Sequence, residues 1–174
     1  MNEASGVGVS VRAADHDDLP AVAAIYTPYV AHTVITFETE PPDGTAWATR
    51  FDAVVARGLP FLVAESGGEV VGYAYAGPWK ERAAYRHTVE DAIYLAPGST
   101  GRGIGRLLLD ALLVACTSAG VRQVVAVVAD SGDPASARLH ARCGFREVGR
   151  LERVGFKHGR WVDTVLMQRS LIPR

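Results

Sequence analysis

Hydrophobic and polar positions along this chain repeat with two periods, one typical of strands and the other typical of helices. Valines alternate with small or polar residues over positions 7–11, which predicts a first strand. Two helices are expected next, over 15–30 with a cap at Asp15 and over 47–56, and Pro28 is expected to end or kink the first. The remaining segments continue this alternation. Strands are predicted over 60–65, 69–75, 88–95, 121–129, 145–153 and 162–170, and helices over 104–119 and 135–142.

This order of elements predicts an α/β protein with a mixed central sheet flanked by helices. Ser66-Gly67-Gly68 lies between two strands and indicates a hairpin. Segment 121–129 is mostly apolar and rich in valine, as expected of a central strand that is buried on both faces. Segment 155–161 contains two glycines and is expected to be a linker between the last two strands. No repeat or long linker divides the sequence, so we expect one domain over residues 1–174.

Composition and charge exclude several classes of protein. Hydrophobic residues make up 48% and charged residues 21% of the 174 positions, which is an ordinary globular balance. Eighteen Lys and Arg against nineteen Asp and Glu give a net charge of −1, so no basic excess points to nucleic acid. The apolar runs are much shorter than the about 20 residues of a membrane-spanning helix, and the first residues do not resemble a signal peptide. Two cysteines make no disulfide framework, and the histidines show no ligand spacing, so we expect a cytoplasmic protein without a metal.

The turn before the third long helix is the most informative segment. Glycines at positions 101, 103 and 105 allow the backbone to approach a ligand closely. The first N–H groups of a helix lack internal partners, and the helix dipole adds partial positive charge, to which Arg102 and Arg106 contribute. These features predict a site for phosphate or pyrophosphate, the alternative being a glycine-rich connection without a ligand. The Gly-Lys-Ser/Thr of a nucleotide P-loop is missing, and the turn comes too late in the chain for a dinucleotide fold.

With this turn and this order of elements, the chain resembles the GNAT acetyltransferase superfamily. The phosphate loop of that family has the form Arg/Gln-x-x-Gly-x-Gly/Ala, which residues 100–105 match except at Thr100. The resemblance implies that the amides of 101–106 hold the pyrophosphate of acetyl-CoA and that the strand at 93–95 pairs with its pantetheine arm. It also implies a contact from the short helix and the turn before it. The cofactor-binding residues implied are Ile93, Tyr94, Leu95, Thr100, Gly101, Arg102, Gly103, Ile104, Gly105, Arg106, Asp133 and Ser136.

Four longer segments, at 33–42, 73–80, 88–90 and 155–163, resemble the phosphinothricin acetyltransferase branch and its methionine sulfoximine acetylating relatives. That branch acetylates the α-amino group of small amino-acid analogues, which implies the same reaction here by direct attack, and a homodimer. Two alternatives stay open. One is acetylation of another small amine or amino acid, and the other is a noncatalytic acyl-CoA-binding module.

Acetyl transfer to an amine requires a group that removes a proton, and Glu90 is the candidate base. Glu90 matches the branch's glutamate, and a carboxylate in an apolar site can act directly or through water. Its neighbour Asp91 is expected on the opposite face of the sheet. His140 stands where many family members carry a tyrosine that acts as general acid, and imidazole can donate or orient a proton near neutrality. The alternatives are a solvated strand residue for Glu90 and a packed helix residue for His140.

The amino-acid substrate offers a carboxylate and a polar head group, and arginine suits planar oxyanions. Candidates come from the irregular segment before Glu90, from the loop at 33–42 and from the segment at 155–161, which could close the pocket from a neighbouring subunit. A packing or surface role is the alternative for each. Cys143 follows His140 by three residues, but direct transfer needs no thiol, so covalent catalysis is disfavoured. The substrate candidates are Phe37, Glu38, Arg82, Tyr85, Lys157, His158 and Trp161.

Overall fold

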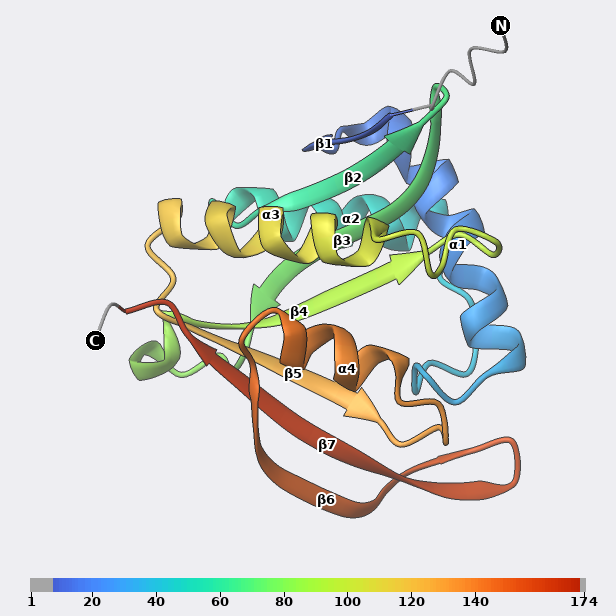
Figure 1. Cartoon of the computed structure of the whole chain (residues 1–174), viewed down its shortest axis with the longest axis vertical. Coiled ribbons are helices and arrows are strands. Elements are labelled where there is room, and N and C mark those ends of the chain that lie inside the picture. The colour runs from blue at the N-terminus through green and yellow to red at the C-terminus, as the bar shows by residue number, and fades with distance from the viewer. Residues whose placement is uncertain (1–7, 173–174) are drawn as a thin grey trace, which may run out of the picture.

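The computed structural model describes residues 8–172, and its strands form one mixed sheet in the order β1-β2-β3-β4-β5-β7-β6 (Figure 1). Two predictions fall on residues outside the described range: the start of the first strand at Val7, and the absence of a signal peptide at the first residues. β4 and β5 are parallel, and the other neighbouring strands are antiparallel, which confirms the predicted mixed sheet. The strands are β1 (Val9–Ala13), β2 (Phe61–Ser66), β3 (Glu69–Pro78), β4 (Thr88–Leu95), β5 (Gln123–Ala129), β6 (Arg146–Lys157) and β7 (Arg160–Ser170).

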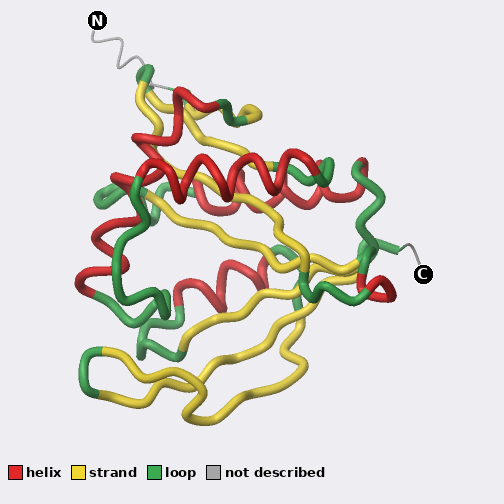
Figure 2. Tube along the Cα trace, turned by 180° about the vertical axis from the view of Figure 1, so that it is seen from behind, coloured by secondary structure: helices red, strands yellow, loops and turns green. Residues whose placement is uncertain are grey.

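Helices cover both faces of the sheet (Figure 1). α3 (Ile104–Ser118) and α4 (Ala135–Arg142) lie on one face, where Leu108, Leu109 and Leu112 of α3 are fully buried. α1 (Leu19–His32) and α2 (Gly44–Ala56) lie on the other, over an aromatic core that includes Trp47 and Tyr73. Figure 2 shows the same layers from behind, with helices on both sides of the strands. Two short 3-10 helices, η1 (His16–Asp18) and η2 (Ala83–Tyr85), precede α1 and β4.

The predicted hairpin between the second and third strands is confirmed. β2 and β3 are antiparallel neighbours joined at Gly67 and Gly68, whose φ angles are 63° and 83°. Glycine adopts this left-handed backbone without the strain that a side chain would cause. The hairpin places β3 beside β4, so that the strand leading to the glycine turn is supported along its whole length.

Pro28 does not end the first helix, contrary to the expectation. α1 continues to His32 with Pro28 inside it. Proline removes one helical hydrogen bond, but the last turn is held by tertiary contacts. Val30 is buried in the core, and the Tyr29 hydroxyl donates to the Leu95 carbonyl oxygen at 2.8 Å. Packing of this turn against the sheet therefore outweighs the missing bond.

The expected linker at 155–161 is also wrong, because most of it is paired strand. Gly155 lies opposite Val162 and Lys157 opposite Arg160, so β6 and β7 form a long hairpin at the edge of the sheet. The turn is limited to His158 and Gly159, with φ angles of 50° and 74°. A two-residue turn with both residues left-handed matches the twist of a hairpin.

Smaller differences concern two element limits and the burial of one strand. α2 begins at Gly44, earlier than expected, because the Asp43 side chain accepts a hydrogen bond from the Ala46 amide. β3 extends to Pro78. Val127 of β5 is 37% exposed, contrary to the prediction of a strand buried on both faces, and it lies where β5 has separated from β4.

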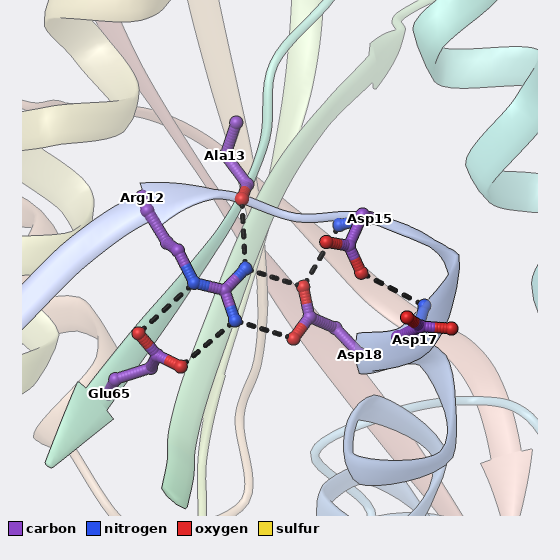
Figure 3. Close-up of polar contacts among 6 residues, drawn as sticks. All are labelled: Arg12, Ala13, Asp15, Asp17, Asp18 and Glu65. Atoms are coloured by element: carbon purple, nitrogen blue, oxygen red, sulfur yellow. Dashed lines mark hydrogen bonds and ion pairs between the residues drawn. The ribbon is translucent and has the colours of Figure 1, made fainter. Parts of the chain in front are cut away.

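Ion pairs fasten the start of α1 to the outer strands (Figure 3). Two nitrogens of Arg12 donate to the Asp18 carboxylate at 2.7 and 2.8 Å, and two donate to Glu65 at 2.9 and 3.0 Å. Hydrogen bonding to Arg12 lowers the pKa of Asp18, although burial opposes this, and it lowers the pKa of Glu65 as well. Asp15, the expected cap, caps η1 by accepting from the Asp17 amide, and η1 leads directly into α1.

Candidate active site

A split between the two parallel strands creates a large cleft. β4 and β5 pair through Thr88, Val89 and Glu90, and beyond Glu90 the strands separate (Figure 1). The backbone edge of β4 that faces β5 is therefore not paired with β5 over residues 91–95. The cleft has a volume of about 920 Å³ and is lined from both faces of the sheet.

The glycine turn forms one end of this cleft, because Gly101, Gly103 and Gly105 line it. Gly101 and Gly103 have φ angles of 75° and 81°, and a Cβ atom at either would meet no atom within 4 Å. Backbone conformation, and not lack of space, therefore requires glycine there. Gly103 is the N-cap of α3, and the Leu107 amide donates to its carbonyl oxygen at 3.1 Å. The amides of 104–106 precede this bond and have no helical acceptor.

Further groups at this end suit an anionic ligand. Arg106, Arg138 and Arg142 line the cleft, whereas Arg102 is exposed outside it. Arg138 and Arg142 are four residues apart on α4, and this helical spacing is a signal that the sequence analysis missed. The other predicted cofactor-binding residues that line the cleft are Ile93, Tyr94, Leu95, Thr100, Asp133 and Ser136.

Two of these residues already have hydrogen-bond partners. The Asp133 side chain accepts from the Ala135 amide at 2.9 Å, which holds the turn before α4. The Leu95 carbonyl oxygen accepts from Tyr29. Ile104 does not line the cleft; its side chain is buried in the core beneath α3.

Glu90 lies at the point where β4 and β5 separate, and its side chain lines the cleft. Among residues 8–172 the carboxylate of Glu90 has no hydrogen-bond partner. Burial raises the pKa of Glu90, and the charge of Asp91 raises it further, while Lys80 opposes the shift. A half-buried carboxylate with a raised pKa and free oxygens has the chemistry of a general base.

His140 lies on the other side of the cleft and is almost fully buried, with 3% of its surface exposed. Its Nε2 lies 2.9 Å from Oδ2 of Asp91, and its Nδ1 lies 2.8 Å from the Ser136 carbonyl oxygen. Burial lowers the pKa of His140, but the hydrogen bond and charge of Asp91, with the Ser136 carbonyl, outweigh burial and raise it. The predicted alternation is confirmed, since Asp91 hydrogen-bonds His140 of α4, while no hydrogen bond joins the side chain of its strand neighbour Glu90 to α4. Sequence reasoning missed this pair because its members are 49 positions apart.

The α1 side of the cleft consists of aromatic and hydroxyl-bearing side chains. Tyr26, Thr36 and Tyr75 line it, and the Tyr26 hydroxyl lies 2.5 Å from Oγ1 of Thr36. Burial raises the pKa of Tyr75 to about 12, so its hydroxyl keeps its proton at neutral pH. These groups offer hydrogen bonds beside Glu90 without adding charge.

None of the predicted substrate residues is among the residues that line the cleft. Glu38 pairs with Arg50 at 2.7 Å. His158 belongs to a separate pocket of about 350 Å³, together with His32 and Arg160. Arg82 and Tyr85 are exposed around η2, and Trp161 is 60% exposed on β7.

Two of these residues connect the loop at 33–43 with the β6–β7 hairpin. Nζ of Lys157, which is buried, donates to the Thr36 carbonyl oxygen at 2.8 Å. The ring of Phe37 covers Gly155 so closely that a Cβ there would lie 2.3 Å from the ring. The loop supplies Ile35 and Thr36 to the cleft wall, so the hairpin supports that wall.

Other chemistry has less support from these residues. Burial raises the pKa of Cys143 to about 11, which disfavours the thiolate that covalent catalysis requires. Within residues 8–172 no group of three or more His, Cys, Asp or Glu side chains could hold a metal ion. In the same part of the chain no helix is long and apolar enough to span a membrane.

Comparison with known proteins establishes the class. Residues 23–145 match the family model described as Acetyltransferase (GNAT) family. The chain therefore belongs to the GNAT acetyltransferases, which confirms the predicted family and fold.

Relatives in one branch of that family are similar over nearly the whole chain. Phosphinothricin N-acetyltransferase of Alcaligenes faecalis is 51% identical over 162 residues, which are 93% of this chain and 82% of that protein. An L-methionine sulfoximine/L-methionine sulfone acetyltransferase of Pseudomonas paraeruginosa is 39% identical, covering 96% of this chain and 97% of that protein. The crystal structure of a phosphinothricin acetyltransferase from Sinorhizobium meliloti in complex with acetyl-CoA superposes with a TM-score of 0.90 at 43% identity, covering 94% of this chain and 88% of that one.

Proposed function

We propose that this protein transfers the acetyl group of acetyl-CoA to the α-amino group of a small amino-acid analogue of the phosphinothricin or methionine sulfoximine type. The observation that carries the proposal is the split between β4 and β5, with an uncapped glycine turn at one end and Glu90 where the strands separate. The names of the relatives at 51% and 39% identity support the substrate class. We further propose that the whole chain is one acetyltransferase domain. The two free, buried cysteines support a reducing, cytoplasmic setting.

The residues around the turn fit acetyl-CoA, which supplies an acetyl group already activated as a thioester. The amides of 101–106 and the guanidinium of Arg106 would hold its pyrophosphate. The edge of β4 at 93–95 would hydrogen-bond the extended pantetheine arm as a neighbouring strand does. Thr100 would contribute less to cofactor binding than the long polar side chain of the family pattern. Asp133 would contribute less than an amide, because its carboxylate can only accept and already accepts from the Ala135 amide.

Glu90 would accept the proton that the substrate ammonium must lose before its nitrogen can attack. Its raised pKa brings it closer to neutrality, where a base accepts a proton with less penalty. The hydroxyls of Tyr26, Thr36 and Tyr75 would orient the substrate beside it. His140 has both ring nitrogens in hydrogen bonds, so it is better suited to holding a proton than to removing one.

A homodimer would bring further substrate contacts to the cleft. β6 is an edge strand, and Phe156 and Trp161 are 57% and 60% exposed with their ring centroids 5.1 Å apart. Exposed aromatic side chains on an unpaired edge support an interface there. His158 and Trp161, which belong to the same hairpin as Phe156, would then help to close a cleft of the second subunit. Sedimentation of Phe156→Arg beside Val55→Arg, an exposed control on α2, tests this, since we expect only the first to be monomeric.

Free-thiol release from acetyl-CoA across a panel of amines tests the function. Release that depends on phosphinothricin or methionine sulfoximine supports the proposal. Release with other amines alone assigns a different substrate to the same site. Tight acetyl-CoA binding without amine-dependent release contradicts catalysis and supports a binding module. Glu90→Gln is the matched variant, because it keeps the size of the side chain and removes the base.

A further inference from the structure

The buried contact between Asp91 and His140 determines how many protons the imidazole carries. The Ser136 carbonyl oxygen can only accept a hydrogen bond, so Nδ1 of His140 must donate to it at 2.8 Å. Nε2 faces Oδ2 of Asp91 at 2.9 Å, and an ionised carboxylate also only accepts. A proton must therefore lie between Nε2 and Oδ2. With an ionised Asp91, the imidazole is doubly protonated.

The surroundings keep this pair away from water and fix its geometry. The side chains of His140 and Asp91 are 4% and 1% exposed, and the Phe145 ring packs edge-on against the imidazole at 5.0 Å. Oδ1 of Asp91 has no hydrogen-bond partner among the described residues, although both side chains line the cleft. A buried carboxylate with one free oxygen is costly, which favours a functional reason for its presence.

Two other titratable groups couple to the pair. Cys116 of α3 lies on the same face of the sheet, and burial, with the charge of Asp91, raises its pKa to about 12, so it stays neutral. Glu90 is the neighbour of Asp91 in β4 and projects to the opposite face. The negative charge of Asp91 therefore acts on His140 from one side and on Glu90 from the other.

We propose that Asp91 is a positioning residue for acetyl transfer, holding the second proton on Nε2 of His140 so that an imidazolium forms one wall of the cleft. This inference rests on the proposed function of the cleft. The proposal assigns different roles to His140 and Glu90 where β4 and β5 diverge. His140, with two N–H groups engaged, presents positive charge in a site where the reaction develops negative charge, and Glu90 acts as the base.

Asp91→Asn tests the proposal with little change in shape. The amide can donate to Nε2 of a neutral His140 while Nδ1 still donates to Ser136, so packing is kept and the second proton is lost. The matched control is Asp52→Asn, which alters an exposed carboxylate that contacts His16 at 3.0 Å on the surface. His140→Gln identifies the His140 resonance among the five histidines by its loss.

The first readout is an NMR titration of the imidazole, which needs neither acetyl-CoA nor activity. We expect His140 to titrate above the ordinary value of 6.5 in the parent protein and below it in Asp91→Asn, because burial remains while the partner's charge is gone. Asp52→Asn should leave the His140 titration unchanged. Equal titration in the parent and Asp91→Asn would overturn the proposal, as would an unprotonated Nε2 in the parent protein at pH 6.

The second readout is the dependence of kcat on pH. Loss of the Asp91 charge lowers the pKa of both His140 and Glu90, so we expect both limbs of the profile to move to lower pH. At pH 7.5 kcat should fall by at least about tenfold, as for loss of a general acid–base contribution. A uniform loss without displacement would mean that Asp91 is only structural. If no amine were acetylated, the proposed function would fail, while the titration would still decide the state of the pair.

Discussion

Replacing Lys157 with methionine removes one charged hydrogen bond and keeps most of the volume of the side chain. Lys157 is 4% exposed, and its Nζ donates to the Thr36 carbonyl oxygen at 2.8 Å. Loss of such a bond leaves a buried carbonyl without its donor and costs about 2 kcal/mol. In a chain of this length that cost lowers Tm by about 4–8 °C. Chemical denaturation and thermal melting measure it directly.

The same change has a separate effect on the cleft. Thr36 and its neighbour Ile35 line the α1 side, so a looser loop should weaken binding of the amine. We expect KM for the amine to rise by about tenfold, because small displacements of positioning groups have large effects. The Kd of acetyl-CoA should stay within about twofold, because the glycine turn lies at the other end of the cleft.

These two measurements separate a supporting role of Lys157 from direct contact with substrate. Arg146→Met is the matched control, since Arg146 is an exposed basic residue on the same strand. A normal Tm with a raised amine KM would mean that Lys157 binds substrate directly. A lowered Tm with an unchanged amine KM would refute the argument that the hairpin shapes the cleft through the loop.

Three further predictions follow from single side chains. Glu90→Gln should lower kcat at least about a hundredfold with little change in the Kd of acetyl-CoA. In the parent enzyme, kcat should fall as pH drops through a pKa above the ordinary glutamate range, because a protonated Glu90 cannot accept a proton. Steady-state kinetics against pH measure this, and an acid limb that survived the substitution would contradict it. Arg12→Met should lower the free energy of unfolding at pH 7 by about 2 kcal/mol, a reduced figure because Arg12 is 38% exposed. Asp18 has a lowered pKa, so this stabilisation is present above the pKa of Asp18 in the unfolded chain and is lost as pH falls through its pKa in the folded protein. Denaturation at several pH values should show that the free energy of unfolding falls less steeply with acidification in the variant than in the parent. Equal slopes in the two proteins would be the contrary result. Gly103→Ala, at a φ of 81°, should cost about 1 kcal/mol and weaken acetyl-CoA binding, and an unchanged Kd by calorimetry would argue against the turn as the site.

The order of elements could be predicted because the periodic segments are long and bounded by glycine or proline. β4 and α4 have the predicted limits, and α3 begins where the glycine turn indicates. Pro28 misled because local propensity carries no information about the contacts of Val30 and Tyr29 with the sheet. The hairpin at 155–161 misled because glycine and aromatic residues are compatible with both a linker and an edge strand.

The parts of the candidate site that come from one contiguous motif could be predicted, but contacts between side chains far apart in the sequence could not. The glycine turn and Glu90 come from contiguous motifs. Asp91 could not be assigned, because its partner His140 is brought to it by the packing of α4 beside the split strands. For the same reason the sequence offered no sign that Lys157 is buried against the Thr36 backbone, 121 residues away.

Backbone NMR during addition of acetyl-CoA tests the central claim most directly. We expect the largest changes at the amides of residues 101–106 and along the edge of β4 at 93–95, because those groups would hold the pyrophosphate and the pantetheine arm. Changes concentrated around the smaller pocket at His158, or no change at saturating acetyl-CoA, would contradict the claim.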